Sequence, residues 1–360
     1  MSVPQQLRTL IVGGRGVGAV HAQALGHVRN ASVVAVAGSS QRTARETARR
    51  LGVPRWGDYR ELVADPETEV VHVCTPNDEH LPVVRAAVLA GKHVVCEKPV
   101  AATVAHAAEM VRLTTRGMGK AFLCYKYRYL PLVRRLRELV AGGMLGPIHA
   151  VRGHYLQSWK LDAAPGDWRC DPARAGFSPV LLDIGTHLID LVEHVLGVPA
   201  TRPTARIRDA GPAGLPQASV LFSAGEALGS IAVSQVSPAS DNHLFLQVDG
   251  RDATATWKYD HHESLLMTRQ DGPTALDTGS AGGLRQVATT GWENSEAPLA
   301  SAIALFQDIY DQIQVPDRSE RPPQLVDGLR HLRFFAEALT EGGSGARAGR
   351  THEPAAAEGA

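Results

Sequence analysis

Residues Val70 to Pro99 read VVHVCTPNDEHLPVVRAAVLAGKHVVCEKP. This order predicts a strand, a polar turn, a helix, a glycine turn and a second strand that ends on Glu97-Lys98-Pro99. Pro99 has no backbone N–H for a β-ladder, so the second strand must stop there. A lysine at the carboxyl end of such a strand lies where doubly wound sheets bind ligands. We therefore expect Lys98 to be held rigidly at a ligand site.

The same alternation of apolar strand and amphipathic helix continues on both sides of this stretch. Further apolar strands are predicted at Leu7–Val12, Ser32–Ala37 and Ala121–Tyr125. Continuous apolar strands alternating with helices indicate a parallel sheet that is covered on both faces. We therefore predict an α/β dinucleotide-binding domain over residues 1–124.

After this unit the pattern changes to that of an α+β domain over residues 125–340. Alternating strands separated by turn signals are predicted at Ile148–Tyr155, Ala218–Phe222, Gly229–Val236, His243–Val248 and Ala253–Tyr259. Helices are predicted at Pro131–Gly143, Pro179–Leu196, Leu299–Ile313 and Gln324–Leu339. This combination indicates an open, mainly antiparallel sheet with helices on one face. The Gly-, Ala- and Glu-rich tail, residues 341–360, is predicted to be disordered.

Composition excludes several functions. Basic and acidic side chains balance at 37 each, so no basic field indicates a nucleic-acid or membrane partner. No run approaches the ~18 apolar residues of a membrane span, and MSVPQQLRTL has no apolar signal segment. No CxxC pair exists, which predicts reduced thiols in the cytoplasm and no metal site. The four cysteines are Cys74, Cys96, Cys124 and Cys170.

A glycine loop follows the first predicted strand and precedes a helix. It reads Gly13-Gly14-Arg15-Gly16-Val17-Gly18. A strand before it and a helix after it are the setting that a dinucleotide fingerprint requires, because helix amides and the helix dipole bind a pyrophosphate. In the G-x-G-x-x-G register the middle glycine is Arg15, so Gly16 is expected to supply the close backbone approach instead. An ordinary glycine turn is the alternative interpretation.

The end of the second predicted strand bears on cofactor choice. It reads Gly38-Ser39-Ser40-Gln41-Arg42 and holds no acidic residue for a ribose 2′-hydroxyl. Two hydroxyls and an arginine suit a 2′-phosphate, since arginine binds phosphate oxygens in a bidentate manner. We therefore predict NADP(H), with NAD(H) as the less favoured cofactor. A surface turn with a solvated Arg42 is the alternative.

A helix in the second half carries a polar face. Asp183, His187, Asp190 and His194 are spaced by four, three and four residues, which places them on one side of a helix. An imidazole near a lysine and a carboxylate suits proton transfer. A merely solvated polar face would show the same spacing. The opposite, apolar stripe contains Ile184, Leu188, Leu191 and Val195.

Six segments of the chain, taken in order, resemble the Gfo/Idh/MocA oxidoreductases, the group of glucose-fructose oxidoreductase and inositol dehydrogenase. The resemblance covers about Leu7 to Leu339, and its AGKHVVCEKP segment is highly specific. The matching segments are Gly18–His21, Cys74–His80, Ala90–Pro99, Tyr127–Pro131, Trp168-Arg169 and Asp183–Asp190.

The resemblance implies a Rossmann domain, a second domain with an open sheet like that of glyceraldehyde-3-phosphate dehydrogenase, and a nicotinamide between them. It implies that Lys98, Asp183 and His187 are catalytic. Tyr127 and Phe177 are expected in the substrate pocket. The residues expected to bind the cofactor are Gly13, Arg15, Gly16, Val17, Gly18, Ser39, Ser40, Arg42, Thr75, Asn77, His80, Glu97, Lys98, Arg128, Trp168 and Arg169.

We therefore expect an NADP-dependent oxidoreductase that acts on a secondary alcohol or ketone, on a sugar, a cyclitol or a related metabolite. Two alternatives are a C=N or C=C reductase for a non-sugar metabolite and a non-catalytic NADP(H) sensor. Two departures from the family pattern concern the site: Arg15 replaces a glycine, and Phe177-Ser178-Pro179 replaces a small Gly-rich segment. A homodimer or homotetramer through the open sheet is expected, because a wide exposed apolar face is a liability.

Overall fold

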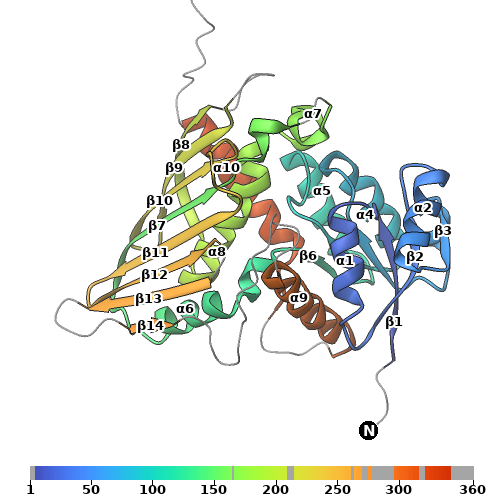
Figure 1. Ribbon diagram of the computed structural model, residues 1–360, viewed down its shortest axis with the longest axis horizontal. Coiled ribbons are helices and arrows are strands. Elements are labelled where there is room, and N and C mark those ends of the chain that lie inside the picture. The colour runs from blue at the N-terminus through green and yellow to red at the C-terminus, as the bar shows by residue number, and fades with distance from the viewer. Residues whose placement is uncertain are drawn as a thin grey trace, which may run out of the picture.

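The structure, a computed structural model, describes residues 5–163, 166–208, 215–260, 263–269, 275–277, 296–315 and 321–341. Two sheets form its framework, each with helices packed against it (Figure 1). Residues 342–360, and with them nearly all of the predicted tail, lie outside the described residues.

The first sheet has six parallel strands in the order β3-β2-β1-β4-β5-β6. Its central strands are wholly apolar or nearly so, because helices cover both faces. The strands are β1 (Leu7–Val12), β2 (Ala31–Ala37), β3 (Arg55–Gly57), β4 (Val70–Val73), β5 (His93–Cys96) and β6 (Ala121–Leu123).

Two apolar clusters lie on the two faces of this sheet. One contains Leu10, Val71 and Val94 with the helices that follow β3, β4 and β5, and the other contains Ile11 and Val95 with α1 and a helix from the far end of the chain. The helices of this unit are α1 (Val17–Leu25), α2 (Gln41–Leu51), α3 (Tyr59–Ala64), η1 (Asn77–Glu79), α4 (His80–Leu89) and α5 (Val104–Thr114).

Two C-terminal helices return to this first unit. In Figure 1, α9 (Glu296–Gln314) lies beside α1, and its Phe306 and Ile309 belong to the same buried cluster as Ile11. The first half of α10 (Leu325–Glu341) packs in the first unit and its second half in the other, through Leu329 and Phe335 respectively. The chain after the second sheet therefore ties the two units together.

The second sheet has eight strands in the order β14-β13-β12-β11-β7-β10-β9-β8. All neighbours are antiparallel except β7 and β10, which pair in parallel. The strands are β7 (Ile148–Leu156), β8 (Ala200–Arg208), β9 (Gln217–Ala224), β10 (Ala227–Ser234), β11 (His243–Gly250), β12 (Ala253–Tyr259), β13 (Glu263–Arg269) and β14 (Ala275–Asp277).

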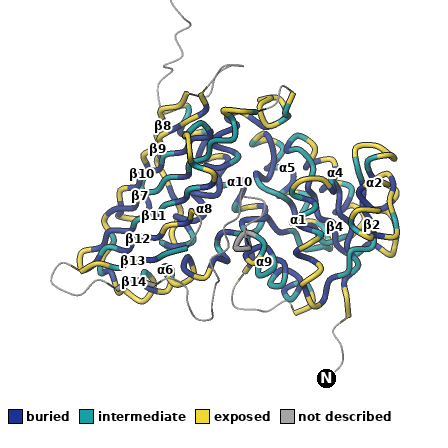
Figure 2. The backbone as a smooth tube through the Cα atoms, viewed as in Figure 1, coloured by how far each residue is buried: buried dark blue, intermediate teal, exposed yellow. Residues whose placement is uncertain are grey.

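Helices cover one face of this second sheet and leave the other face without a helix among the described residues (Figure 1). The central helix α8 is buried along almost its whole length (Figure 2). The predicted apolar stripe of this helix is confirmed, because its four residues lie in the main core cluster. The remaining elements are η2 (Lys126–Tyr129), α6 (Pro131–Ala141), η3 (Trp159–Asp162), η4 (Trp168–Cys170), α7 (Pro172–Ala175), η5 (Leu181–Gly185) and α8 (Thr186–Leu196).

The predicted fold class is confirmed, a parallel sheet followed by an open, mainly antiparallel one. The prediction omitted β3, β8, β13 and β14. β8 escaped notice because Pro203 and three arginines interrupt its alternation, and its register shifts between Thr201 and Thr204. The predicted helix Pro179–Leu196 begins as expected but contains a π-helical turn, η5. None of the described helices combines the length and the apolar character needed to cross a membrane.

Candidate active site

Lys98 and Asp183 form one of the contacts between the two units. Lys98 follows β5 directly, and its Nζ donates hydrogen bonds to the Asp183 side chain at 2.7 Å and to the Asp183 backbone carbonyl at 2.8 Å. Both side chains are mostly buried, with exposed fractions of 17% and 31%. A strand end in one domain and a helix in the other thus bring an ammonium and a carboxylate together.

Asp183 is fixed from both sides. It lies in the π-helical turn η5, a distortion that is frequent at functional sites. Its second carboxylate oxygen accepts a hydrogen bond of 2.6 Å from the Gln235 side chain. Burial raises the pKa of the Asp183 carboxyl, but the charge and hydrogen bond of Lys98, together with the charges of Arg169 and Lys160, outweigh burial, so the pKa lies below its usual value. The pair is therefore an ammonium beside a carboxylate at neutral pH.

His187 lies one turn further along, in an aromatic surrounding. Its imidazole is 4.7 Å from the ring of Tyr127 and 5.9 Å from that of Tyr125, between ring centroids. Burial, with a smaller contribution from Lys98 and Lys126, holds the pKa of His187 well below its usual value. The ring is therefore neutral at physiological pH and can accept a proton.

A polar network extends from Tyr127 beside His187. The Tyr127 hydroxyl is 3.0 Å from that of Tyr155, which donates to the Asn242 side-chain oxygen at 2.5 Å. Gln157 donates to the same oxygen at 3.0 Å, and the Trp159 indole donates to Gln157 at 3.0 Å. Residues from η2, β7 and the segment before β11 thereby form one connected group beside the histidine.

The glycine loop has the shape that a nicotinamide dinucleotide requires. A side chain at Gly13 or Gly18 would collide with backbone, 2.5 Å from the Cys74 carbonyl oxygen and 2.0 Å from the Gly13 carbonyl oxygen. Gly16, with a φ of 50°, faces open space at the uncapped start of α1. The Thr75 hydroxyl at the neighbouring strand end is buried without a hydrogen-bond partner among the described residues. The positive end of the helix dipole and an unsatisfied hydroxyl fit a pyrophosphate-containing cofactor, although the Gly18 and Ala19 amides already bond the Arg15 and Gly16 carbonyls at 3.0 Å each.

The start of α2 forms the second part of this cofactor region. Ser40 caps the helix by accepting from the Thr43 amide at 3.2 Å. Ser39 and Arg42 are exposed beside it. Arg15 reaches the same helix, with its guanidinium 3.5 Å from Glu46. An arginine that replaces a family glycine thus lies beside α2.

Four residues expected at the cofactor hold other protein groups in this structure. Asn77 donates to the Ala175 carbonyl at 2.8 Å, and Arg128 pairs with buried Asp190 at 2.5 and 2.8 Å. The two ring nitrogens of His80 lie 3.0 and 3.2 Å from the backbone carbonyls of Thr75 and Val100, and Glu97 contacts His21 at 2.9 Å. These contacts position the loops and α8, and a direct role toward the cofactor stays a prediction.

Residues 157–163 and 166–177 approach the site from the second unit. Arg169 is close enough to Asp183 to lower the pKa of its carboxyl, and its guanidinium lies 5.0 Å from the centre of the Trp168 ring. Phe177 precedes the helix that carries Asp183, and 38% of it remains exposed. Ser178 accepts the first helical hydrogen bond, from Leu182 at 2.9 Å, as expected of a helix cap.

The sequence analysis did not identify two residues of the site. Gln235 is fully buried, and the signal for it was a glutamine at an inward-facing position of the β10 alternation. Lys126 follows β6 at the sheet edge that carries Lys98. Burial lowers the pKa of the Lys126 ammonium to about 8, although the Glu97 carboxylate acts in the opposite direction. No local pattern distinguished it from a surface lysine.

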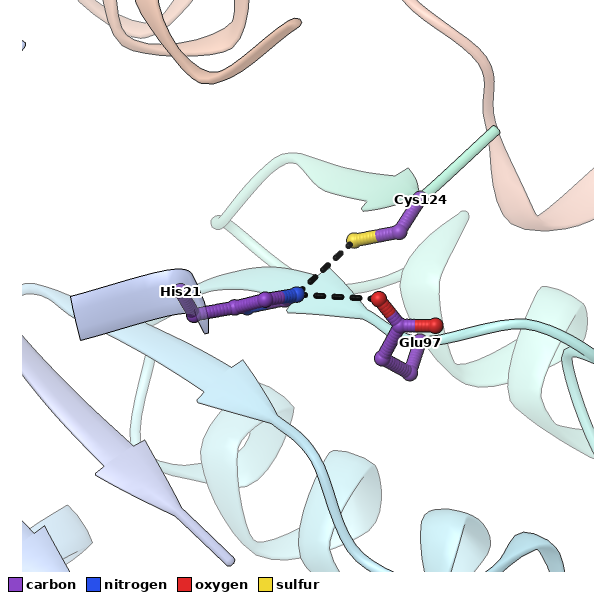
Figure 3. Close-up of side chains that lie close together, drawn as sticks. All are labelled: His21, Glu97 and Cys124. Atoms are coloured by element: carbon purple, nitrogen blue, oxygen red, sulfur yellow. Dashed lines mark hydrogen bonds and ion pairs between the residues drawn. The ribbon is translucent and has the colours of Figure 1, made fainter. Parts of the chain in front are cut away.

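Figure 3 shows a further group beside Lys98, formed by His21, Glu97 and Cys124. Their ligand atoms lie within 4.8 Å of one another, close enough for a metal ion. The His21–Glu97 contact of 2.9 Å has the length of a hydrogen bond. Burial, with the nearby Glu97 charge, raises the pKa of the Cys124 thiol well above its usual value. A hydrogen-bonded pair beside a protonated thiol describes this group better than a metal centre.

Two family models match this chain. The first, an oxidoreductase family with an NAD-binding Rossmann fold, matches residues 7–122. The second, the GFO/IDH/MocA C-terminal domain, matches residues 133–256. The chain belongs to the Gfo/Idh/MocA oxidoreductase family. The predicted family is therefore confirmed, and the named relatives of this enzyme are dehydrogenases.

Two curated relatives and one solved structure illustrate the similarity. Levoglucosan dehydrogenase of Pseudarthrobacter phenanthrenivorans is 28% identical over 281 residues, 71% of this chain and 70% of the relative. D-xylose 1-dehydrogenase (NADP(+)) 2 of Haloferax volcanii is 31% identical over 204 residues, 56% of this chain and 61% of the relative. An inositol dehydrogenase homolog from Azotobacter vinelandii, complexed with NAD+, has a TM-score of 0.83 at 26% identity, covering 95% and 97% of the two chains. Several further curated relatives are matched over about half of their length.

Proposed function

We propose that this chain is a cytoplasmic NADP-dependent dehydrogenase or ketoreductase that acts on a secondary alcohol of a sugar, a cyclitol or a related metabolite. The observation that carries the proposal is the Lys98–Asp183 contact of 2.7 Å with the neutral His187 imidazole one turn away. Membership of an oxidoreductase family and the sugar dehydrogenases among its relatives support it.

In the proposed reaction the nicotinamide supplies the hydride chemistry and the protein aligns the substrate and moves the proton. His187, neutral because it is buried, accepts the hydroxyl proton during oxidation. The Lys98 ammonium donates a hydrogen bond to the same oxygen and stabilises its alkoxide character. Asp183, held by Lys98 and Gln235, orients both the ammonium and the substrate. Microscopic reversal gives ketone reduction.

The two alternative functions remain distinguishable by assay. A reductase of C=N or C=C bonds would turn over imines or enones in preference to sugars. A sensor would bind NADP(H) and turn over nothing, although a sensor has no need of the Lys98, Asp183 and His187 arrangement. Incubating the protein with NADP+ and a panel of levoglucosan, D-xylose, D-glucose and myo-inositol, while following NADPH formation, tests the proposal against both.

Arg42 is expected to select NADP(H). Arg42→Ala should weaken NADPH binding by about 2 kcal/mol, roughly 30-fold in dissociation constant, because a charge-assisted phosphate contact is lost. NADH binding should stay nearly unchanged. Tryptophan fluorescence titration of both cofactors measures this, with Arg49→Ala, on the same helix but away from its start, as the matched control. Equal affinity of the native protein for NADH and NADPH would contradict the assignment.

Phe177 is proposed to narrow the substrate pocket. The residue is 38% exposed, more than expected of a closely packed hydrophobic staple. Phe177→Gly should raise kcat/KM for small polyols relative to larger substrates with an apolar portion. An unchanged substrate profile together with a lower melting temperature would show that Phe177 only stabilises the helix start.

We also propose a homodimer or homotetramer through the open face of the second sheet. Three leucines are exposed on this face, two on the adjacent strands β9 and β10 and one on β13. An exposed apolar sheet face favours association. Leu228→Lys should shift the protein toward the monomer in light-scattering chromatography, with Leu89→Lys, an exposed leucine of α4, as the control. A native protein that is already monomeric would contradict the proposal. The three leucines are Leu221, Leu228 and Leu266, with exposed fractions of 54%, 65% and 36%.

A further inference from the structure

A hydrogen-bonded row of five polar side chains crosses the interior of the first unit, and the proposed reaction does not use these side chains. It starts at Glu97, next to Lys98, and passes through His21 and His72 to Tyr310 and Thr9. The Glu97 carboxylate lies 2.9 Å from one His21 nitrogen, and the Nδ1 atoms of the two histidines lie 2.9 Å apart. His72 Nε2 is 3.1 Å from the Tyr310 hydroxyl, which is 2.6 Å from that of Thr9.

This hydrogen-bonded row of side chains comes from five separate parts of the fold and is shielded from bulk water. One member, Glu97, directly follows β5, and the other four lie on α1, β4, α9 and β1. These four members have exposed fractions of 2% or less. Figure 3 shows the Glu97 end, where the His21 ring points at the carboxylate. Buried polar groups without bulk water must form their hydrogen bonds with one another or with neighbouring protein groups. The positions of the protons are therefore restricted to a few arrangements.

One arrangement has a neutral His21. Thr9 donates to the Tyr310 oxygen, Tyr310 to His72 Nε2, and His72 Nδ1–H to His21 Nδ1. His21 Nε2–H then donates to the ionised Glu97. Each of the four contacts from Thr9 to Glu97 then has a donor and an acceptor, with all donors pointing toward the carboxylate, as the ring tautomers allow. The Thr9 proton lies toward Tyr310 in this arrangement and therefore not toward the Leu7 carbonyl.

The other arrangement has one more proton, and the hydrogen bonds from His21 to Thr9 run in the opposite direction. A protonated His21 donates from Nε2 to Glu97 and from Nδ1 to His72 Nδ1. His72 Nε2–H then donates to Tyr310, Tyr310 to Thr9, and Thr9 to the Leu7 carbonyl, 3.2 Å away. Each of the four contacts again has a donor and an acceptor. Burial, together with the His21 charge, holds the pKa of His72 well below its usual value, so His72 is neutral in both arrangements.

We propose that this hydrogen-bonded row of side chains is a proton-holding site that takes up one proton at His21 while the four hydrogen bonds between the five side chains are kept. The Glu97–His21 pair then changes its charge from negative to neutral beside Lys98, whose backbone N–H donates to the second Glu97 oxygen at 3.0 Å. Its use in catalysis rests on the proposed function, whereas the two arrangements themselves do not.

Several other groups face this site and affect the proton. Cys74 lies 3.3 Å from His21 Nδ1 and Cys124 lies 3.9 Å from Nε2, both as protonated thiols because burial raises their pKa values. Phe306 of α9 contacts the ring without charge. The Lys126 ammonium interacts with the Glu97 carboxylate. Uptake of a proton at His21 should therefore favour its loss from Lys126.

Ring-nitrogen NMR of the full chain labelled with 15N-histidine tests the proposal. His21→Gln and His72→Gln spectra assign the two rings. As the pH rises from about 5 to about 10, His21 should lose a proton and His72 should change its protonated nitrogen from Nε2 to Nδ1 at the same midpoint. A His72 that keeps one tautomer, or a His21 that keeps one protonation state, would overturn the proposal.

Thr9→Val gives a second test, because the proposal predicts the direction in which the His21 titration midpoint shifts. In the protonated arrangement it removes the acceptor for the Tyr310 hydroxyl, whereas in the neutral arrangement Tyr310 keeps its acceptor. The His21 midpoint should therefore fall by roughly one pH unit. Thr9→Ser should restore it, and Thr68→Val should leave it unchanged, because buried Thr68 bonds only the Leu62 carbonyl of the same unit. Equal shifts in Thr9→Val and Thr68→Val would contradict the reversal.

Discussion

Lys98→Met lowers the turnover number by about 10²- to 10⁴-fold, the size of effect expected when a positioned acid or hydrogen-bond donor is lost. The variant removes the ammonium that would contact the reacting oxygen, and it removes one hydrogen bond to the Asp183 carboxylate while the bond from Gln235 remains. NADPH affinity should change much less, because the glycine loop and the start of α2 are untouched. Steady-state kinetics and fluorescence titration separate the two effects.

Lys92→Met is the matched control for this loss. Lys92 lies at the other end of β5, and its Nζ donates to the Asp65 carbonyl at 2.9 Å. It should keep near-native turnover. If Lys98→Met also turns over at a near-native rate with a native urea unfolding curve, Lys98 does not act on the substrate.

His187→Asn should lower the rate of alcohol oxidation by a similar ~10²- to 10⁴-fold, because the proton acceptor is removed. The direction of the pH dependence follows from burial, which holds the pKa of His187 well below its usual value. The neutral, accepting form is present above that lowered pKa. The native rate should therefore persist as the pH falls through about 6.5, the ordinary histidine value.

His194→Asn separates the role of His187 from general damage to α8. His194 lies two turns further along the helix, where Arg137 donates to its Nδ1 at 2.9 Å, and it is distant from Lys98 along the helix. This variant should keep most of the activity. Near-native oxidation by His187→Asn across the pH range would show that another group, with Tyr127 as the next candidate, carries the proton.

Local pattern was sufficient for the parallel sheet and for the position of Lys98. Apolar strands, glycine turns and Pro99 are short-range signals, and the four-three-four spacing of the α8 side chains needs only helical geometry. The return of α9 and α10 to the first unit was not predictable in this way. Their contacts with Ile11 and Leu10 clusters join residues some 300 positions apart in the sequence, and no local pattern encodes such a pairing.

The candidate site likewise contains residues that local sequence predicts and residues that only tertiary packing places there. Lys98, Asp183 and His187 were singled out because each has a local setting, and the structure brings them together. Gln235 and Lys126 reach the site only through tertiary packing. The Asp190 carboxylate, for which a solvated helix face was the alternative interpretation, is instead buried against Arg128, since a buried charge requires a partner. Arg128 thereby fixes α8.

The most direct test of the account follows NADP+ reduction spectrophotometrically with the sugar and cyclitol panel, for the native protein and Lys98→Met in parallel. NADPH binding is measured on the same preparations. The account predicts NADPH formation with at least one secondary alcohol by the native protein, at least a 100-fold loss in Lys98→Met, and similar NADPH affinity in both. Equal turnover by the two proteins, or tight NADPH binding by the native protein without oxidation of any alcohol or reduction of the matching ketones, would contradict it.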